Sequence, residues 1–130
     1  MLIGVNDVVR GVPGSMYAAN VEYILDALVA AVGAERALAV STPDYTLTPH
    51  GADYGNPAQQ RAAIARFNET MAAACARRGI AFVSIDAVAN EAALDPSLVA
   101  NDGLHPSAVQ YARWVDLIAP VATKMLRARR

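Results

Sequence analysis

The stretch Ala37-Leu38-Ala39-Val40-Ser41 decides the fold class, because it is a short and almost entirely apolar run. A strand that is covered on both faces of a parallel sheet has this pattern, whereas a strand with one wet face alternates apolar and polar residues. A second run, Ile80-Ala81-Phe82-Val83-Ser84-Ile85, has the same character. The two runs predict buried parallel strands and therefore an α/β protein.

Helical patterns of apolar residues precede and separate these runs. A first helix is predicted to begin at Gly14 or Ser15 and to end at Gly33. A second begins at Asn56-Pro57-Ala58-Gln59, a capping-box pattern with proline at the first helical position, and ends at Gly79. The predicted buried residues are Tyr17, Val21, Ile24, Leu25, Leu28 and Val32 in the first helix, then Ile64, Phe67, Met71, Ala74 and Cys75 in the second.

After the second run, the sequence predicts a short helix over residues 87–93 and a long helix from Pro106 to about Arg127. Proline suits the first helical position because it has no N–H to leave unsatisfied. Trp114 falls outside the apolar stripe of the last helix. The predicted inner face is Ala108, Tyr111, Ala112, Val115, Ile118, Ala119, Ala122 and Met125.

Residues 1–5 have the pattern of the end of a strand. The predicted elements then alternate between strand and helix, which implies a parallel sheet with right-handed crossovers. The chain has 130 residues, of which 55% are hydrophobic. Residues 1–130 are therefore predicted to form one domain with a packed core.

The turn Asn101-Asp102-Gly103-Leu104-His105-Pro106 places a carboxylate and an imidazole three residues apart across a glycine. Gly103 can adopt a positive φ, which lets Asp102 fold back on the Nδ1 side of His105. The carboxylate would then fix the tautomer, stabilise the imidazolium and leave Nε2 free as a general base. The alternative interpretation is an ordinary turn in which His105 only caps a helix.

A second polar turn follows the strand predicted at the N-terminus, in Leu2-Ile3-Gly4-Val5-Asn6-Asp7. In an open parallel sheet, the carboxyl ends of the strands face the binding crevice. The amide of Asn6 would be a neutral N–H donor there, which is the type of group that stabilises an oxyanion.

Gly4-Val5-Asn6-Asp7 and Asp102-Gly103-Leu104-His105-Pro106 resemble the third and fifth sequence blocks of the SGNH hydrolases, also called GDSL-type esterases and lipases. The resemblance implies a three-layer α/β/α domain with a flavodoxin-like parallel sheet. It also implies hydrolysis of a small-molecule carboxylic ester by acyl transfer, with no cofactor or metal. By position, Asn6 would be an oxyanion donor, Asp102 the residue that orients the base, and His105 the base. Val5, Tyr45 and Leu104 are predicted to contact the substrate.

The family's Gly-Asp-Ser block, which carries the nucleophilic serine, and its block-two glycine have no counterpart in this sequence. The resemblance therefore covers the C-terminal two-thirds of such a domain, with three strands remaining, and this chain alone is predicted to be almost inactive. Its first strand would have an unpaired apolar edge that is open to association. Two alternatives stay open: a non-catalytic binding module of the same fold, and a phosphoesterase that uses Asp7, Asp102 and His105 on a metal.

The long segment between Thr42 and Pro57 is predicted to be a substrate-facing loop, with a mobile surface loop as the alternative. His50, within it, is expected to be solvated rather than catalytic. Asp86 follows the second apolar run and is a rival for the acid beside the base. Its expected role is to cap the next helix.

A net charge of −1 and the lack of a broad basic cluster argue against a nucleic-acid partner. The Arg-rich end that begins at Lys124 is expected to meet the dipole of the last helix. No apolar run reaches the roughly 18 residues that span a bilayer, and no signal sequence is recognised at the N-terminus. Localisation stays open: cytoplasmic if Met1 is the true start, with export allowed if a segment precedes it.

Overall fold

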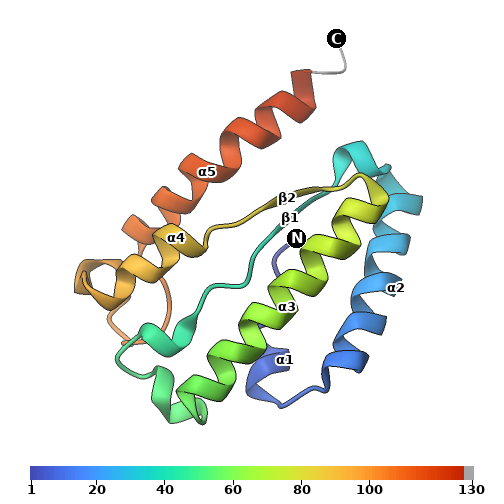
Figure 1. The fold of residues 1–130 in the computed structure, drawn as a ribbon. Coiled ribbons are helices and arrows are strands. Elements are labelled where there is room, and N and C mark those ends of the chain that lie inside the picture. Colours follow the sequence, from blue (N-terminus) through green and yellow to red (C-terminus); the bar gives the residue numbers. More distant parts are fainter. Residues whose placement is uncertain (128–130) are drawn as a thin grey trace.

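Two short parallel strands lie at the centre of the computed structural model, which describes residues 1–127 (Figure 1). β1 (Leu38–Val40) and β2 (Ala81–Val83) pair with each other, and Ala39 stands opposite Phe82. Both strands occupy the middle of the apolar runs from which they were predicted. The prediction of a parallel α/β arrangement is therefore confirmed, with strands shorter than the runs.

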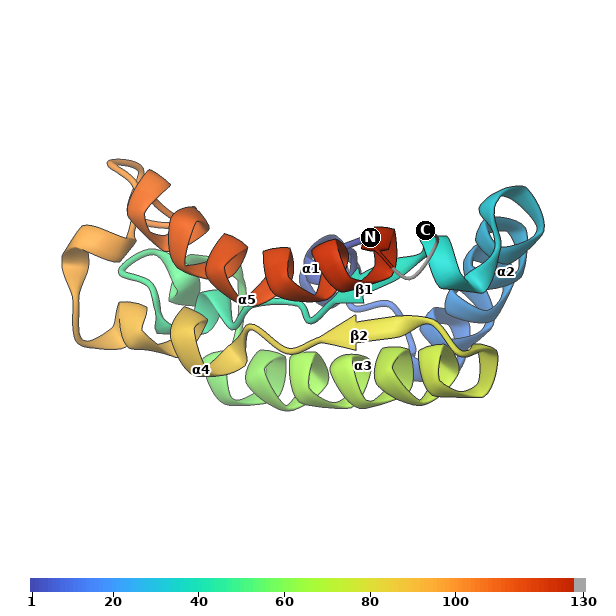
Figure 2. The ribbon, with the colours of Figure 1, turned by 90° about the horizontal axis from the view of Figure 1, so that it is seen from above.

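Helices cover both sides of this strand pair. α3 (Pro57–Arg78) and α5 (Ala108–Arg127) lie on opposite sides of it, and α2 (Gly14–Val32) packs beside α3 (Figure 2). Two short helices are α1 (Val5–Val9) and α4 (Asp86–Ala89). The remaining helical segments are short 3-10 turns: η1 (Ala34–Arg36), η2 (Tyr45–Leu47), η3 (Gly51–Tyr54), η4 (Asn90–Ala93) and η5 (Pro96–Leu98).

Local signals place α2 and α3 where the sequence predicted them. The side chain of Asn56 accepts the Gln59 N–H at 3.1 Å, and Gly79 ends α3 in the left-handed conformation. The predicted stripe of α3 is buried, as are Tyr17, Val21 and Leu25 of α2. Ile24 and Val32 of α2 are 37% and 38% exposed, so they lie at the margin of the buried face rather than within it.

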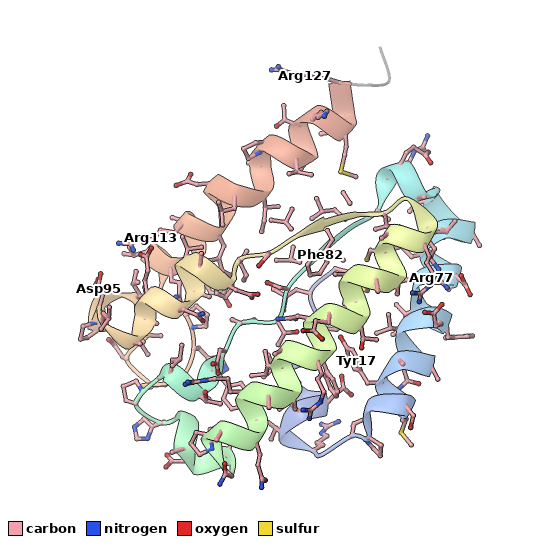
Figure 3. The ribbon with its side chains drawn as sticks, viewed as in Figure 1. Tyr17, Arg77, Phe82, Asp95, Arg113 and Arg127 are labelled. Carbon is pink, nitrogen blue, oxygen red and sulfur yellow. The ribbon has the colours of Figure 1, made fainter. Side chains whose placement is uncertain are left out.

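The contact between α2 and α3 combines ring stacking with ion pairs. The rings of Tyr17 and Phe67 stack with their centroids 3.8 Å apart. Arg78 pairs with Glu22 and Asp26 at 2.6 and 2.7 Å, and Figure 3 shows Arg77 reaching from α3 toward α2. Among residues 1–127, α2 is the one helix long and apolar enough to cross a membrane. That signal is weak, because core helices pass the same test.

Residues 1–5 differ from the strand that the sequence predicted. Val5 begins helix α1, and no strand is assigned to residues 1–4. Met1 nevertheless lies along β1, because its amino group donates to the Leu38 C=O at 2.6 Å and its C=O accepts the Val40 N–H at 2.9 Å. The sheet of the described chain thus has two strands instead of the three that were predicted, and two hydrogen bonds join Met1 to β1.

The last helix begins at Ala108 rather than Pro106, and it turns a different stripe toward the sheet. Trp114, which the sequence placed outside the inner face, is 4% exposed and packs in a core cluster with Val83 of β2. Tyr111 and Val115, predicted to face inward, are 52% and 56% exposed. The prediction was wrong because the helix carries two apolar stripes, and the stripe that includes the large indole of Trp114 is buried.

The other residues of the predicted inner face divide into two groups. Ile118, Ala122 and Met125 are partly buried, whereas Ala108, Ala112 and Ala119 are exposed. Of the Arg-rich end, residues 128–130 lie outside the described part.

Candidate active site

The turn from Asp102 to His105 joins a carboxylate to an imidazole. Gly103 has a φ of +70°, and this lets both Leu104 N–H and His105 N–H donate to Asp102 Oδ1 at 2.9 Å. The second carboxylate oxygen lies 2.6 Å from His105 Nδ1. The two backbone N–H groups, that of His105 first, and then the His105 side chain lower the pKa of Asp102 to about 2. The carboxylate is therefore ionised at neutral pH. Nε2 is the nitrogen of the His105 ring that does not contact Asp102.

A short antiparallel bridge fixes the residues around this turn. Val99 pairs with Pro106, and the Ala100 N–H donates to the His105 C=O at 2.8 Å. Pro106 is consequently part of a bridge and not the first residue of a helix, which corrects the prediction that the last helix begins at Pro106. Ser107 stands just before α5, where its hydroxyl accepts the Gln110 N–H at 3.3 Å.

His50 lies against the same turn. Its backbone N–H donates to the Gly103 C=O at 3.0 Å, and a Cβ at Gly103 would stand only 2.3 Å from the Cδ2 atom of His50. The side chain of His50 is 59% exposed, as expected, but its Nδ1 lies 2.8 Å from Asp53. This pair was not predicted, although Asp53 follows His50 by three residues, the spacing that joins Asp102 to His105.

The N-terminal turn brings Asn6 to the site through a close approach at Gly4. Gly4 has a φ of +127°, and a Cβ there would lie 2.7 Å from the hydroxyl oxygen of Thr42. That hydroxyl donates to the Ile3 C=O at 2.6 Å, which ties the residues before α1 to the end of β1. Helix α1 then begins at Val5 and carries Asn6 in its first turn, with the side chain exposed.

Asn68 of α3 holds the end of β1 from the other direction. Its side-chain oxygen accepts the Thr42 N–H at 2.8 Å, and its side-chain nitrogen donates to the Thr42 C=O at 2.9 Å. Both backbone groups of Thr42, a residue only 2% exposed, are thereby satisfied. Pro43, the next residue, is thus fixed at the edge of the site. No local sequence signal linked Asn68 to this role, because the two residues are far apart in the chain.

One cavity of about 240 Å³ brings most of the predicted site residues together. Asn6 and His105 line it, and so do the predicted contact residues Val5, Tyr45 and Leu104. Asp102 contacts His105 instead of lining the cavity. The rest of the lining consists of Pro43 and Tyr54, which belong to the segment predicted to face the substrate, and of Val9 and Pro106, which were not predicted to line a site. A larger, more open groove of about 750 Å³ runs along α5, but it has no carboxylate-imidazole pair.

Two tyrosines form one wall of this cavity. Tyr45 is 7% exposed, whereas Tyr54 is 44% exposed, and their rings meet edge to face with centroids 6.3 Å apart. Burial raises the pKa of Tyr45, with a smaller contribution from Asp44. Its hydroxyl has no hydrogen-bond partner within residues 1–127. Tyr45 belongs to η2 and Tyr54 to η3, so the segment after β1 forms this wall from two 3-10 turns and not from an extended loop.

Four of the five serine hydroxyls in the sequence have partners other than His105. Ser41 is fully buried, and its Oγ donates to Asp86 at 2.7 Å and accepts the Ile85 N–H at 2.9 Å. Asp86, the rival acid, thus accepts a hydrogen bond from a serine. It is the first residue of α4 and Ile85 is the N-cap, so the expectation that Asp86 caps this helix was wrong. The hydroxyls of Ser84, Ser97 and Ser107 also form hydrogen bonds elsewhere.

Within residues 1–127, no three side chains of His, Cys, Asp or Glu lie close enough together to hold a metal ion. Asp7, Asp102 and His105 are therefore not gathered into the ligand set that the phosphoesterase alternative requires.

The comparisons with known proteins bear on the chain as a whole. No curated protein and no solved structure matches it. A family model does match, over residues 1–113, and that range includes both the Asn6 turn and the turn from Asp102 to His105. Because the match spans most of the sequence, the chain belongs to the GDSL-like lipase/acylhydrolase family.

Proposed function

We propose that this chain supplies the acid-base and oxyanion parts of a site that hydrolyses carboxylic esters by acyl transfer. The observation that carries the proposal is the 2.6 Å contact between Asp102 and Nδ1 of His105, beside a cavity that His105 shares with Asn6. His105 Nε2 takes the proton of a serine nucleophile and returns it to the leaving alcohol. The Asn6 amide donates to the oxyanion of the tetrahedral intermediate.

Asp102 acts by staying charged. Because its pKa is about 2, it is ionised at every pH at which an imidazole can serve as base. A fixed negative charge at Nδ1 stabilises the imidazolium that forms when His105 takes the proton, and it keeps the tautomer in which Nε2 is the acceptor.

The nucleophilic serine comes from a segment outside this sequence, either upstream or on a second chain. The hydrogen bonds of Ser41, Ser84, Ser97 and Ser107 favour this inference, because all lead away from His105. The incoming segment would pair along residues 1–3, which would then complete a third strand of a flavodoxin-like parallel sheet. Without a nucleophile, serine proteases lose activity on the order of a millionfold, so the isolated chain should show almost no turnover.

The test uses the protein as its own cell makes it, with whatever segment supplies the serine, and measures the hydrolysis of a short-chain p-nitrophenyl ester. His105→Ala should abolish turnover. Asn6→Ala should lower kcat by about 100- to 1000-fold with little change in KM, because an oxyanion donor acts in the transition state. Asn20→Ala, at an exposed position of α2, is the matched control.

Full activity of His105→Ala would refute the assignment of the base. A rise in KM without a fall in kcat for Asn6→Ala would refute the oxyanion role. If an ester bound at this cavity without any turnover, the protein would be a non-catalytic binding module of the same fold and not a hydrolase.

A further inference from the structure

We propose that the cavity beside His105 accepts the acyl group of an uncharged, short-chain ester, and that the ring of Tyr54 sets the length of chain that fits. This inference rests on the proposed function, since it names the substrate of the same site. It extends that function to Tyr54, whose ring meets the Tyr45 ring edge to face in the same wall of the cavity.

The chemistry of the lining selects an uncharged group. Most of the lining side chains are apolar or aromatic, and none is a lysine, arginine, aspartate or glutamate. The carboxylate of Asp102, held against the lining residue His105, adds negative charge beside the cavity. An anionic acyl group would therefore lose its hydration without gaining an ion pair.

The size of the cavity limits the chain length. A water molecule in the liquid takes about 30 Å³, and a methylene group is of similar size, so a cavity of about 240 Å³ has room for about eight non-hydrogen atoms. Such a cavity holds the carbonyl group and a chain of a few carbons. A long fatty acyl chain would leave most of its methylene groups in water.

Tyr54 is the residue that can set this limit. Tyr45 is 7% exposed and belongs to the main core, so its ring cannot be removed without disturbing the fold. Tyr54 is 44% exposed and stands edge-on to the Tyr45 ring, so it forms the outer part of the wall. Its backbone C=O is held by the side chain of Gln60, which fixes the place from which the ring projects.

The experiment measures binding to the chain as it is, with a probe that cannot be cleaved. Methyl ketones from 2-butanone to 2-decanone carry an ester-like carbonyl and no charge, and NMR shifts of the His105 ring and the Leu104 amide report their dissociation constants. Affinity should rise about fourfold for each added methylene until about 2-heptanone, and then level off.

Tyr54→Ala should move this plateau to ketones longer by two carbons or more, whereas Tyr54→Phe should leave it in place because the ring and not the hydroxyl forms the wall. Tyr23→Ala, which removes an exposed ring of α2, is the matched control. Hexanoate at pH 8 should bind more weakly than 2-heptanone, which has the same number of non-hydrogen atoms.

Three results would overturn the proposal: affinity that keeps rising through 2-decanone in the unsubstituted chain, a plateau unmoved by Tyr54→Ala, or tighter binding of hexanoate than of 2-heptanone. Failure of the hydrolase proposal can be distinguished from failure of this inference. If only the hydrolase proposal fails, the protein made by the cell shows no ester turnover, but ketone binding still reaches a plateau. Turnover without a plateau would refute only the chain-length inference.

Discussion

Replacing Gly103 with alanine should destabilise the protein by disturbing the turn that holds Asp102 against His105. The φ of +70° at Gly103 costs about 1–2 kcal/mol for a residue with a Cβ. The new Cβ would also stand 2.3 Å from Cδ2 of His50, well inside van der Waals contact, so the imidazole of His50 must move. Isolating this second effect requires a glycine with a positive φ at which an added Cβ meets no other atom.

Gly11 provides the matched control. Its φ is +66°, and a Cβ there would meet no atom within 4 Å, so Gly11→Ala reports the backbone cost alone. We expect the free energy of unfolding to fall by about 1 kcal/mol for Gly11→Ala and by about 2 kcal/mol or more for Gly103→Ala. Denaturant unfolding with a constant m-value measures both differences.

A double-mutant cycle isolates the contact with His50. In a His50→Ala background the ring is gone, so Gly103→Ala should cost no more than Gly11→Ala does. The reasoning is refuted if Gly103→Ala costs no more than Gly11→Ala in the unsubstituted chain, or if its excess cost survives the loss of the His50 ring.

Three further predictions test the surroundings of the site. Asn68→Ala should lower the free energy of unfolding by about 2 kcal/mol, because it removes two hydrogen bonds from the buried backbone of Thr42, whereas Asn20→Ala should change it little; denaturant unfolding decides. Tyr17→Phe should raise that free energy by about 1 kcal/mol, since the hydroxyl is buried without a partner within residues 1–127, and a loss of stability would point to a hidden partner. The pKa of Asp102 falls from its ordinary 3.8 to about 2 on folding, so its contribution to stability is complete above pH 4 and disappears as the pH falls toward 2. The amide NMR signals of the turn should titrate in that range, and Asp102→Asn should abolish the titration.

The parts of the fold that could be predicted are those with local causes. Asn56 and Gly79 mark the ends of α3 by their own capping chemistry, and the apolar runs around β1 and β2 depend only on burial on both faces. The stripe of α5 could not be predicted in the same way. Its pattern allows two inner faces, and the contact of Trp114 with the strands, which are distant in the sequence, selects between them.

In the candidate site, too, the features with local causes could be predicted, and those that depend on distant contacts could not. The contact between Asp102 and His105 depends on a three-residue spacing and one glycine, so the sequence alone indicates it. Helix α1 replaces the predicted end of a strand because Gly4 packs against Thr42, a contact that no local pattern reveals. The cavity wall at Tyr54 likewise depends on segments that meet only in the folded chain.

In the proposed mechanism, His105, held by Asp102, activates a serine. The most direct measurement treats the protein as its own cell makes it with a fluorophosphonate, which bonds covalently to activated serines, and locates the modified residue by mass spectrometry. We predict one labelled serine, on an upstream segment or on a bound second chain, with labelling lost in His105→Ala and retained in Asn20→Ala. No labelled serine, or labelling that persists in His105→Ala, would contradict the account.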